Sequence, residues 1–413
     1  MINFEQYRLE NGLRVILHKD ETTPMVTVNV LYDVGSRDEQ PDKTGFAHLF
    51  EHLMFGGTPR FPDYDKIAQA AGATNNAFTS KDLTNYYISL PAANLETGLM
   101  LEADRMAGLL FSPESLEVQR KVVIEEFKQR YLNKPYGDVW LEISPLAYQV
   151  HPYAWQTIGK NIEHIRDATL DDVKNFFVKH YNPQNAVLSI SGNIDIASAK
   201  NLVNKWFGAL ERGTAYQREL QNEPPKTQKQ TRKLKRDVPQ NAIYKVYKMP
   251  GRSSAGFYSG DLLSDLMGRG LSSRMYKELV SDKRLFTTAG ASVTGNFDPG
   301  LFIVSGMLSP GVDFGKAEKA LDRIITEVEN GVIPDSELYK IKNRVESTFL
   351  FNNTSHSDIA FHLAWFELMG DAGDINKEVS RYREVKKDEL RSFAGEYLKD
   401  NQSSVLYYES KTS

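Results

Sequence analysis

The chain has 413 residues, of which 41% are hydrophobic and 25% are charged, and its formal net charge is −4. This length fits two domains of about 200 residues each, the slightly acidic balance gives no indication of a nucleic-acid partner, and no apolar run approaches the roughly 20 residues that span a bilayer. The chain contains no cysteine, which excludes disulfides and thiolate metal sites, so a metal would have to be held by histidine and carboxylate side chains.

The first residues, MINFEQYRLENGLRVIL, include Glu5 and Glu10 and lack the basic-then-apolar order of a secretory signal. We therefore expect a cytoplasmic protein, or a periplasmic one if a signal peptide was removed before the numbered sequence begins. We expect neither a membrane nor nucleic acid among its partners.

Strands and helices are grouped along the first half of the chain rather than alternating one by one. Alternating apolar residues predict strands over 13–20 and 25–35 and a hairpin over 75–91. Helical spacing and glycine stop signals predict the helices, which cover 44–55, 61–71, 92–110 and 113–131. This grouping favours an α+β fold class.

A polar stretch near the middle of the chain predicts a division into domains. Residues 212–237 contain two consecutive prolines and many charges and show no apolar periodicity, which is typical of a linker. The predicted domains are therefore 1–211 and 238–413. The basic cluster of the linker allows two interpretations, an attachment point for an acidic partner or a solvated face, and its shortness favours the second.

The two halves of the chain resemble one another. Each half contains an amphipathic helix, a polar turn and an apolar strand in the same order, over 165–190 and 382–408. The stretch 45–57 parallels 256–270 in the same way. These matches predict a two-fold internal repeat. In the second copy, the positions of His48, Glu51 and His52 are taken by residues without imidazoles, which are Asp261, Ser264 and Asp265.

The helix predicted over 44–55 carries three ionisable side chains in an apolar run, His48, Glu51 and His52. The histidines are four residues apart, so they project from one face of the helix with Glu51 beside them. Neutral imidazoles bind Zn²⁺, and catalytic zinc sites combine three protein ligands with one water, whose pKa falls to about 7. A nearby carboxylate can then take the proton of that water. Two core histidines with carboxylate partners are the alternative, and the pattern favours a metal.

A third protein ligand is expected in the helix predicted over 113–131, where Glu125 and Glu126 interrupt an apolar face. With Glu126 in VVIEEF, the HLFEH set resembles the pitrilysin/insulinase family of zinc metallopeptidases, whose motif defines the inverzincins. NNAFTSKDLTNYYISLP and HYNPQNAVLSISGNID also resemble segments of that family. The length is similar to that of the smaller members, such as mitochondrial processing peptidase subunits and their bacterial relatives. The resemblance implies two repeated α/β-roll domains, each an antiparallel sheet packed with helices, in a clam-like half-chamber.

The resemblance also implies a role for individual residues. It assigns His48, His52 and Glu126 to one zinc ion per chain and Glu51 to the general base, with Glu125 as a neighbour outside the ligand set. Many relatives carry a further glutamate two turns before the last ligand, and Gln119 occupies that position here. An amide there can still donate a hydrogen bond, but it contributes no charge.

The stretch Asn76-Ala77-Phe78-Thr79 resembles an edge strand that pairs with an extended peptide substrate, and its first three residues are the predicted substrate-binding positions. An ordinary hairpin is equally consistent with these three residues. The resemblance therefore implies peptide substrates in an extended or unfolded state, and it adds these three positions to the predicted site.

One departure from the family lies in the second half. Self-contained relatives carry an Arg and a Tyr that stabilise the oxyanion, and those positions fall on Val280 and Thr287 here, neither of which can supply such donors. We therefore predict a zinc-dependent endopeptidase that pairs with a homologous subunit carrying the Arg/Tyr pair, a heterodimer, with a homodimer as the alternative. The alternative function is a non-catalytic structural subunit derived from the same fold.

Overall fold

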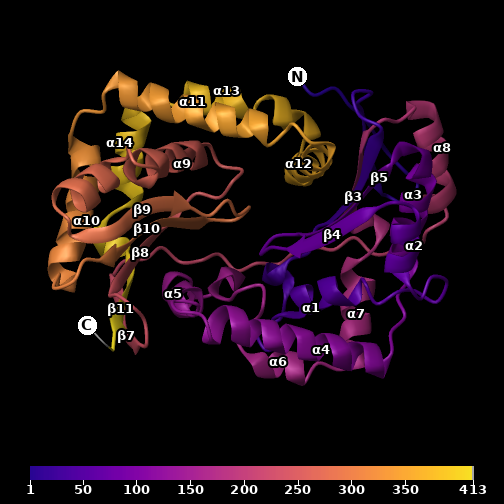
Figure 1. Cartoon of the computed structure of the whole chain (residues 1–413), viewed down its shortest axis with the longest axis horizontal. Coiled ribbons are helices and arrows are strands. Elements are labelled where there is room, and N and C mark those ends of the chain that lie inside the picture. Colours follow the sequence, from indigo (N-terminus) through magenta and orange to yellow (C-terminus); the bar gives the residue numbers. More distant parts are fainter. Residues whose placement is uncertain (412–413) are drawn as a thin grey trace. The chain divides into compact units, whose positions relative to one another are not determined.

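A computed structural model describes residues 1–411 and divides them into two compact units. The first unit consists of Met1–Lys128, Trp155–Leu220 and Leu350–Lys377, and the second consists of Gln129–Ala154, Gln221–Phe349 and the chain from Glu378 onward. Each unit contains one sheet packed against helices (Figure 1), which confirms the predicted α+β class.

The sheet of the first unit has six strands in the order β1-β2-β6-β3-β5-β4. Its strands are β1 (Glu5–Arg8), β2 (Arg14–Lys19), β3 (Met25–Tyr32), β4 (Thr74–Thr79), β5 (Thr84–Pro91) and β6 (Ala186–Gly192). All neighbours pair antiparallel except β2 and β6, which are parallel. β3 and β6 are apolar and buried on both faces, whereas β4 closes one edge of the sheet.

Helices surround this first sheet. They are α1 (Phe46–Leu53), α2 (Tyr64–Ala70), α3 (Leu95–Ala107), α4 (Pro113–Phe127), α6 (Ile162–Arg166), α7 (Leu170–His180), α8 (Ile196–Phe207) and α12 (His356–Met369), with short 3₁₀ turns η1 (Ser36–Asp38), η2 (Ala92–Asn94), η5 (Pro183–Asn185) and η7 (Ala372–Asn376). The start of α4 illustrates the local control of these helices. The Ser112 hydroxyl accepts the Ser115 N–H and Pro113 opens the first turn, a favourable combination at a helix N-terminus.

The sheet of the second unit has five strands in the order β7-β11-β8-β10-β9. Its strands are β7 (Gln230–Arg236), β8 (Ala242–Met249), β9 (Phe286–Val293), β10 (Gly300–Leu308) and β11 (Ser404–Ser410). Its helices are α5 (Val139–Ala147), α9 (Ala255–Gly268), α10 (Phe314–Asn330), α11 (Asp335–Phe351), α13 (Glu378–Glu384) and α14 (Lys387–Tyr397), with the short turns η3 (Lys128–Leu132), η4 (Pro152–Ala154), η6 (Tyr276–Asp282) and η8 (Asp400–Gln402). Within residues 1–411, no helix has both the length and the apolar character needed to cross a membrane.

The strand orders of the two sheets confirm the predicted internal repeat. The series β2-β6-β3-β5-β4 in one unit corresponds to β7-β11-β8-β10-β9 in the other. Each series begins with its single parallel pair and continues antiparallel. Each predicted "antiparallel sheet" therefore includes one parallel pair, because the strand that closes the repeat inserts beside the strand that opens it.

The second copy of the motif helix is α9, and its polar residues have partners inside the second unit. Asp261 accepts a hydrogen bond of 2.6 Å from the Tyr382 hydroxyl, and Asp265 forms ion pairs with Arg344 and Arg269. These contacts attach α9 to α11 and α13. The positions that correspond to the histidines of the first copy therefore serve packing between helices.

The predicted division into domains 1–211 and 238–413 differs from the structural units. α5 belongs to the first predicted domain but packs on β8 and β11, while α12 belongs to the second and packs on β3 and β6. In the second unit, α9, α10 and α14 cover one face of the sheet and α5 covers the other. A sheet with two apolar faces needs helices on both. Each half of the chain therefore contributes one helix to the sheet of the other half, α5 to the second sheet and α12 to the first.

The predicted linker over 212–237 also contains a strand. β7 pairs in parallel with β11, and its arginines reach acidic residues near α5, with Arg232 at 2.7 Å from Glu142 and Arg236 at 2.9 Å from Asp138. An edge strand can carry charges on both faces. Its sequence, QTRKLKR, therefore lacks the apolar alternation by which strands are predicted.

Candidate metal centre

α1 is held at its beginning by a buried carboxylate from the preceding loop. The Glu39 carboxylate accepts the backbone N–H groups of Gly45 and Ala47, both at 2.9 Å, and the Trp155 indole N–H at 3.1 Å. A carboxylate at this place satisfies unpaired N–H groups and complements the helix dipole. Burial raises the pKa of Glu39 to about 8, although its three donors act in the opposite direction.

Gly45 has to be glycine for two reasons. Its φ of 91° lies in the left-handed region, and a Cβ atom there would meet the Ile158 carbonyl oxygen at 2.7 Å. Both the backbone conformation and the lack of room for a Cβ atom therefore require glycine at the turn into α1.

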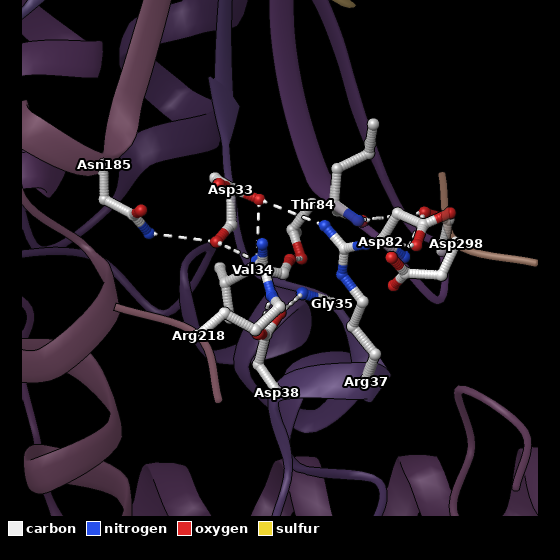
Figure 2. Close-up of polar contacts among 12 residues, drawn as sticks. Asp33, Val34, Gly35, Arg37, Asp38, Asp82, Thr84, Asn185, Arg218 and Asp298 are labelled. Atoms are coloured by element: carbon white, nitrogen blue, oxygen red, sulfur yellow. Dashed lines mark hydrogen bonds and ion pairs between the residues drawn. The ribbon is translucent and has the colours of Figure 1, made fainter. Parts of the chain in front are cut away.

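The loop before α1 is further fixed by an ion-pair cluster (Figure 2). The Arg218 guanidinium lies 2.6 Å from the Asp38 carboxylate and 2.7 Å from that of Asp33, and Arg37 lies 3.1 Å from Asp82. Burial raises the pKa of Asp38, while Arg218 and Arg37 lower it. Arg218 comes from the predicted linker, so this part of the linker is anchored to the loop that leads into the motif helix.

The contacts of Glu39 at the start of α1 suggest a first prediction. Glu39→Ala is expected to lower the free energy of unfolding by about 1–3 kcal/mol, because it leaves the backbone N–H groups of Gly45 and Ala47 without the carboxylate that accepts them. Urea denaturation of the metal-free chain measures this loss without a contribution from zinc binding. Glu10→Ala, at an exposed position, is the control, and an equal change in both variants would refute the capping role.

The structure brings three of the predicted residues together on α1 and α4, which lie side by side (Figure 1). Glu126 Oε2 is 3.6 Å from His48 Nε2, and Glu126 Oε1 is 3.8 Å from His52 Nε2. One ligand atom from each residue lies within 4.8 Å of the other two. The number of residues between α1 and α4 does not determine these distances. They follow only from the way the two helices pack.

The donor set and its spacing fit a zinc ion. Ligands about 2.1 Å from a tetrahedral ion lie about 3.4 Å from one another, which is close to the separations of Glu126 from the two imidazoles. These separations exceed those of hydrogen bonds. Two imidazoles and one carboxylate are also one of the ligand sets that catalytic zinc sites use.

The structure also separates the two adjacent glutamates of α4. The Glu126 side chain is 25% exposed and faces the histidines. The Glu125 side chain is 54% exposed and lies 3.4 Å from Lys128. Gln119 lies two turns before Glu126 and is half-buried. Its hydrogen bond toward the site stays a prediction.

Glu51 lies beside the histidines and contacts β4. The Thr79 hydroxyl donates a hydrogen bond of 2.5 Å to Glu51 Oε2. Sequence reasoning placed Thr79 in the edge strand expected to pair with the substrate but predicted no contact between its hydroxyl and Glu51. The contact depends on the packing of α1 against the end of β4, so no local pattern could have indicated it.

β4 is confirmed as an edge strand. Asn76 and Phe78 are exposed, whereas Ala77 is half-buried and shares a face with Thr79 because side chains alternate along a strand. The Phe78 ring packs at 5.3 Å, edge to face, on Phe361 of α12. The Phe78 side chain is thus engaged within the first unit. The role of these residues in substrate binding stays a prediction.

A second acidic cluster, in the second unit, also has metal-like spacing. Glu318, Asp322 and Asp400 converge, but the ammonium of Lys245 lies 2.9, 2.6 and 2.6 Å from their carboxylates. The Lys245 side chain is 0% exposed. The ammonium of Lys245 already contacts all three carboxylates and that of Lys229 contacts two of them, so the cluster is interpreted as an internal ion-pair network.

Comparison with known proteins gives family matches and full-length relatives. The profile of "Insulinase (Peptidase family M16)" matches residues 14–157, and that of "Peptidase M16 inactive domain" matches residues 167–345. The zinc protease PqqE of Helicobacter pylori is 32% identical over 98% of this chain and 92% of its own length. An uncharacterized zinc protease of Mycobacterium leprae is 28% identical over 94% of this chain and 88% of its own length.

Solved structures show the same fold. The crystal structure of a protease from Helicobacter pylori superposes with a TM-score of 0.92 and 31% sequence identity, covering 99% of this chain and 100% of that one. A peptidase M16 inactive domain from Pseudomonas fluorescens gives a TM-score of 0.89 at 17% identity, with 99% of both chains covered. The second similarity concerns the fold alone.

Proposed function

Because the chain belongs to the insulinase family of peptidases, peptidase family M16, we propose that it is a zinc-dependent endopeptidase acting on extended or unfolded peptides. The observation that supports this proposal most directly is the convergence of His48, His52 and Glu126, with Glu51 on the same helix. The relatives named as zinc proteases support the choice of metal.

In this proposal, His48, His52 and Glu126 hold one zinc ion per chain. When bound, zinc polarises the scissile carbonyl and makes water easier to deprotonate. Glu51 accepts a proton from the attacking water as the water oxygen bonds to the carbonyl carbon. Glu51 then delivers that proton to the leaving nitrogen as the peptide bond breaks.

In the proposed function, the backbone of β4 forms hydrogen bonds with the backbone of the substrate. It ends the sheet order, so its outer edge can accept an extended peptide as an additional strand. Asn76, Ala77 and Phe78 would contribute main-chain groups to this pairing. Only an extended segment can form such a ladder, which is why we propose extended or unfolded peptides as the substrate class.

The proposal is tested by measuring zinc content and peptide hydrolysis on the same purified protein. We expect one zinc per chain, loss of hydrolysis after treatment with a chelator, and recovery when zinc is added back. Hydrolysis that survives complete removal of the metal would contradict the proposed mechanism, and a chain that binds no zinc would contradict the ligand assignment.

A specific observation favours the second candidate, a structural subunit without activity. Val280 packs against the core of the second unit, and the Thr287 hydroxyl donates to the Gln240 side chain at 3.0 Å. Neither residue can replace an Arg/Tyr pair in oxyanion stabilisation. The zinc and hydrolysis measurements distinguish the two candidates, because a structural subunit would not hydrolyse peptides in any assembly.

We further propose that the active form is a heterodimer with a homologous chain that carries the missing Arg/Tyr pair. A homodimer would contain two copies of Val280 and Thr287 and would therefore lack the donors in both sites. A partner with the pair would supply them to this chain.

The expected result is weak hydrolysis by the isolated chain and an increase of about 100- to 1,000-fold with the partner, the usual effect of oxyanion donors. The measurement compares oligopeptide turnover by this chain alone and after co-expression with a homologue that has the pair. As a control, the homologue is used with its Arg and Tyr replaced. Full activity of the isolated chain, unchanged by the partner, would refute the heterodimer.

A further inference from the structure

We propose that Thr79 is a positioning residue that holds the general base Glu51 through its hydroxyl, so that the strand offered to the substrate also orients the base. This inference rests on the proposed function, because it takes Glu51 as the base. It adds a side-chain role for Thr79 to the substrate-pairing role that the family resemblance implies for the strand Asn76-Ala77-Phe78-Thr79.

The contact has the geometry of a strong hydrogen bond. The Thr79 hydroxyl donates to Glu51 Oε2 at 2.5 Å, and hydrogen bonds to a carboxylate group are stronger than those between neutral groups. A glutamate side chain has several rotatable bonds, and a free one samples many rotamers. Fixing Oε2 from β4 restricts those rotamers and so holds the carboxylate of Glu51 in one orientation beside the histidines.

Two buried phenols, Tyr86 and Tyr181, are affected by the charge of Glu51. Burial raises the pKa of Tyr86 well above its usual value, and Tyr181 and Glu51 raise it further. The pKa of Tyr181 is raised by its burial, with Glu51 again contributing. Both phenols therefore stay neutral and add no negative charge near the Glu51 carboxylate.

The position of Thr79 links the base to the substrate strand. Thr79 is the last residue of β4 and lies on the same face as Ala77. An edge strand, which is paired on one side only, opens more easily than a strand that is paired on both sides. A peptide added along Asn76, Ala77 and Phe78 would stabilise β4, and with it the hydroxyl that holds Glu51.

The test compares three variants of the zinc-loaded protein, each assayed in whichever assembly is active for the unmodified chain. Thr79→Val keeps the shape of the side chain but removes the donor. Thr79→Ser keeps the donor but removes a methyl group. Thr74→Val makes the same change at the exposed first residue of β4, on the opposite face, and is the matched control.

In Thr79→Val we expect kcat to fall about 10- to 100-fold, as for the loss of a hydrogen bond to a charged group. KM should stay within about twofold and zinc content near one per chain. Thr79→Ser should recover most of kcat, and Thr74→Val should match the unmodified chain. A loss confined to kcat and recovered by serine distinguishes positioning of the base from damage to the fold.

Two results would overturn the inference while leaving the proposed function intact. One is normal kcat in Thr79→Val. The other is an equal loss in Thr79→Val and Thr79→Ser together with reduced zinc content, which would indicate a purely structural role. An unmodified chain that hydrolyses no peptide in any assembly would instead refute the proposed function, and this inference with it.

Discussion

Glu51→Gln is expected to retain one zinc per chain and to lose hydrolysis by about 100- to 10,000-fold, the range for removal of a general base. The amide preserves the size of the side chain and can still accept the Thr79 hydrogen bond. It cannot take the proton of the attacking water. Because His48, His52 and Glu126 are unchanged, the metal should remain bound.

The measurement pairs metal analysis with peptide turnover on the same sample. Glu125→Gln is the matched control, since it makes the same substitution on an exposed side chain that faces Lys128 rather than the histidines. It should behave as the unmodified chain. Normal turnover by Glu51→Gln would refute the assignment of Glu51 as the base.

Glu126→Ala is expected to weaken zinc binding by roughly 100- to 1,000-fold. This range follows from about 10–16 kcal/mol for a four-ligand structural zinc site, or about 3–4 kcal/mol for each ligand. The two imidazoles remain four residues apart on α1 but lose the Glu126 carboxylate, which approaches both of them. Activity at limiting zinc should fall accordingly.

Glu125→Ala tests the register of α4 directly. Its side chain is 54% exposed and pairs with Lys128, so zinc affinity and stoichiometry should stay unchanged. Competition with a chelator of known affinity measures both variants. Loss of zinc in Glu125→Ala with normal binding in Glu126→Ala would place the third ligand one residue earlier than the structure indicates.

Local sequence patterns were sufficient for the elements of the first unit and for the motif helix. The alternation of apolar residues predicted β2, β3 and the β4–β5 hairpin, and their bounds in the structure lie within or near the predicted ranges. The spacing of His48 and His52 placed both imidazoles on one face of α1, because four residues are about one helical turn. The repeat was also visible, since both halves bury equivalent apolar faces in the same order.

The domain boundaries could not be read from the sequence in the same way. α5 and α12 are ordinary amphipathic or apolar segments, and nothing local indicates that each covers the sheet of the other half. β7 was taken as linker because its side chains are charged and satisfied by distant acidic residues. Both cases depend on contacts between segments that are far apart in the chain, and no local pattern indicates such contacts.

The sequence by itself determined the residue types of the site and the face of α1 that bears the histidines, because hydrogen bonding within one helix fixes those relations. The family resemblance had already favoured Glu126 over Glu125, and the structure places Glu126 near the histidines. Only the tertiary structure showed that Glu39 holds the start of α1 and that Thr79 contacts Glu51. Each of these contacts joins separate elements. Their geometry is set by the packing of α1 against α4 and β4. This packing depends on how side chains fill the core of the whole unit, so it cannot be inferred from any short stretch of sequence.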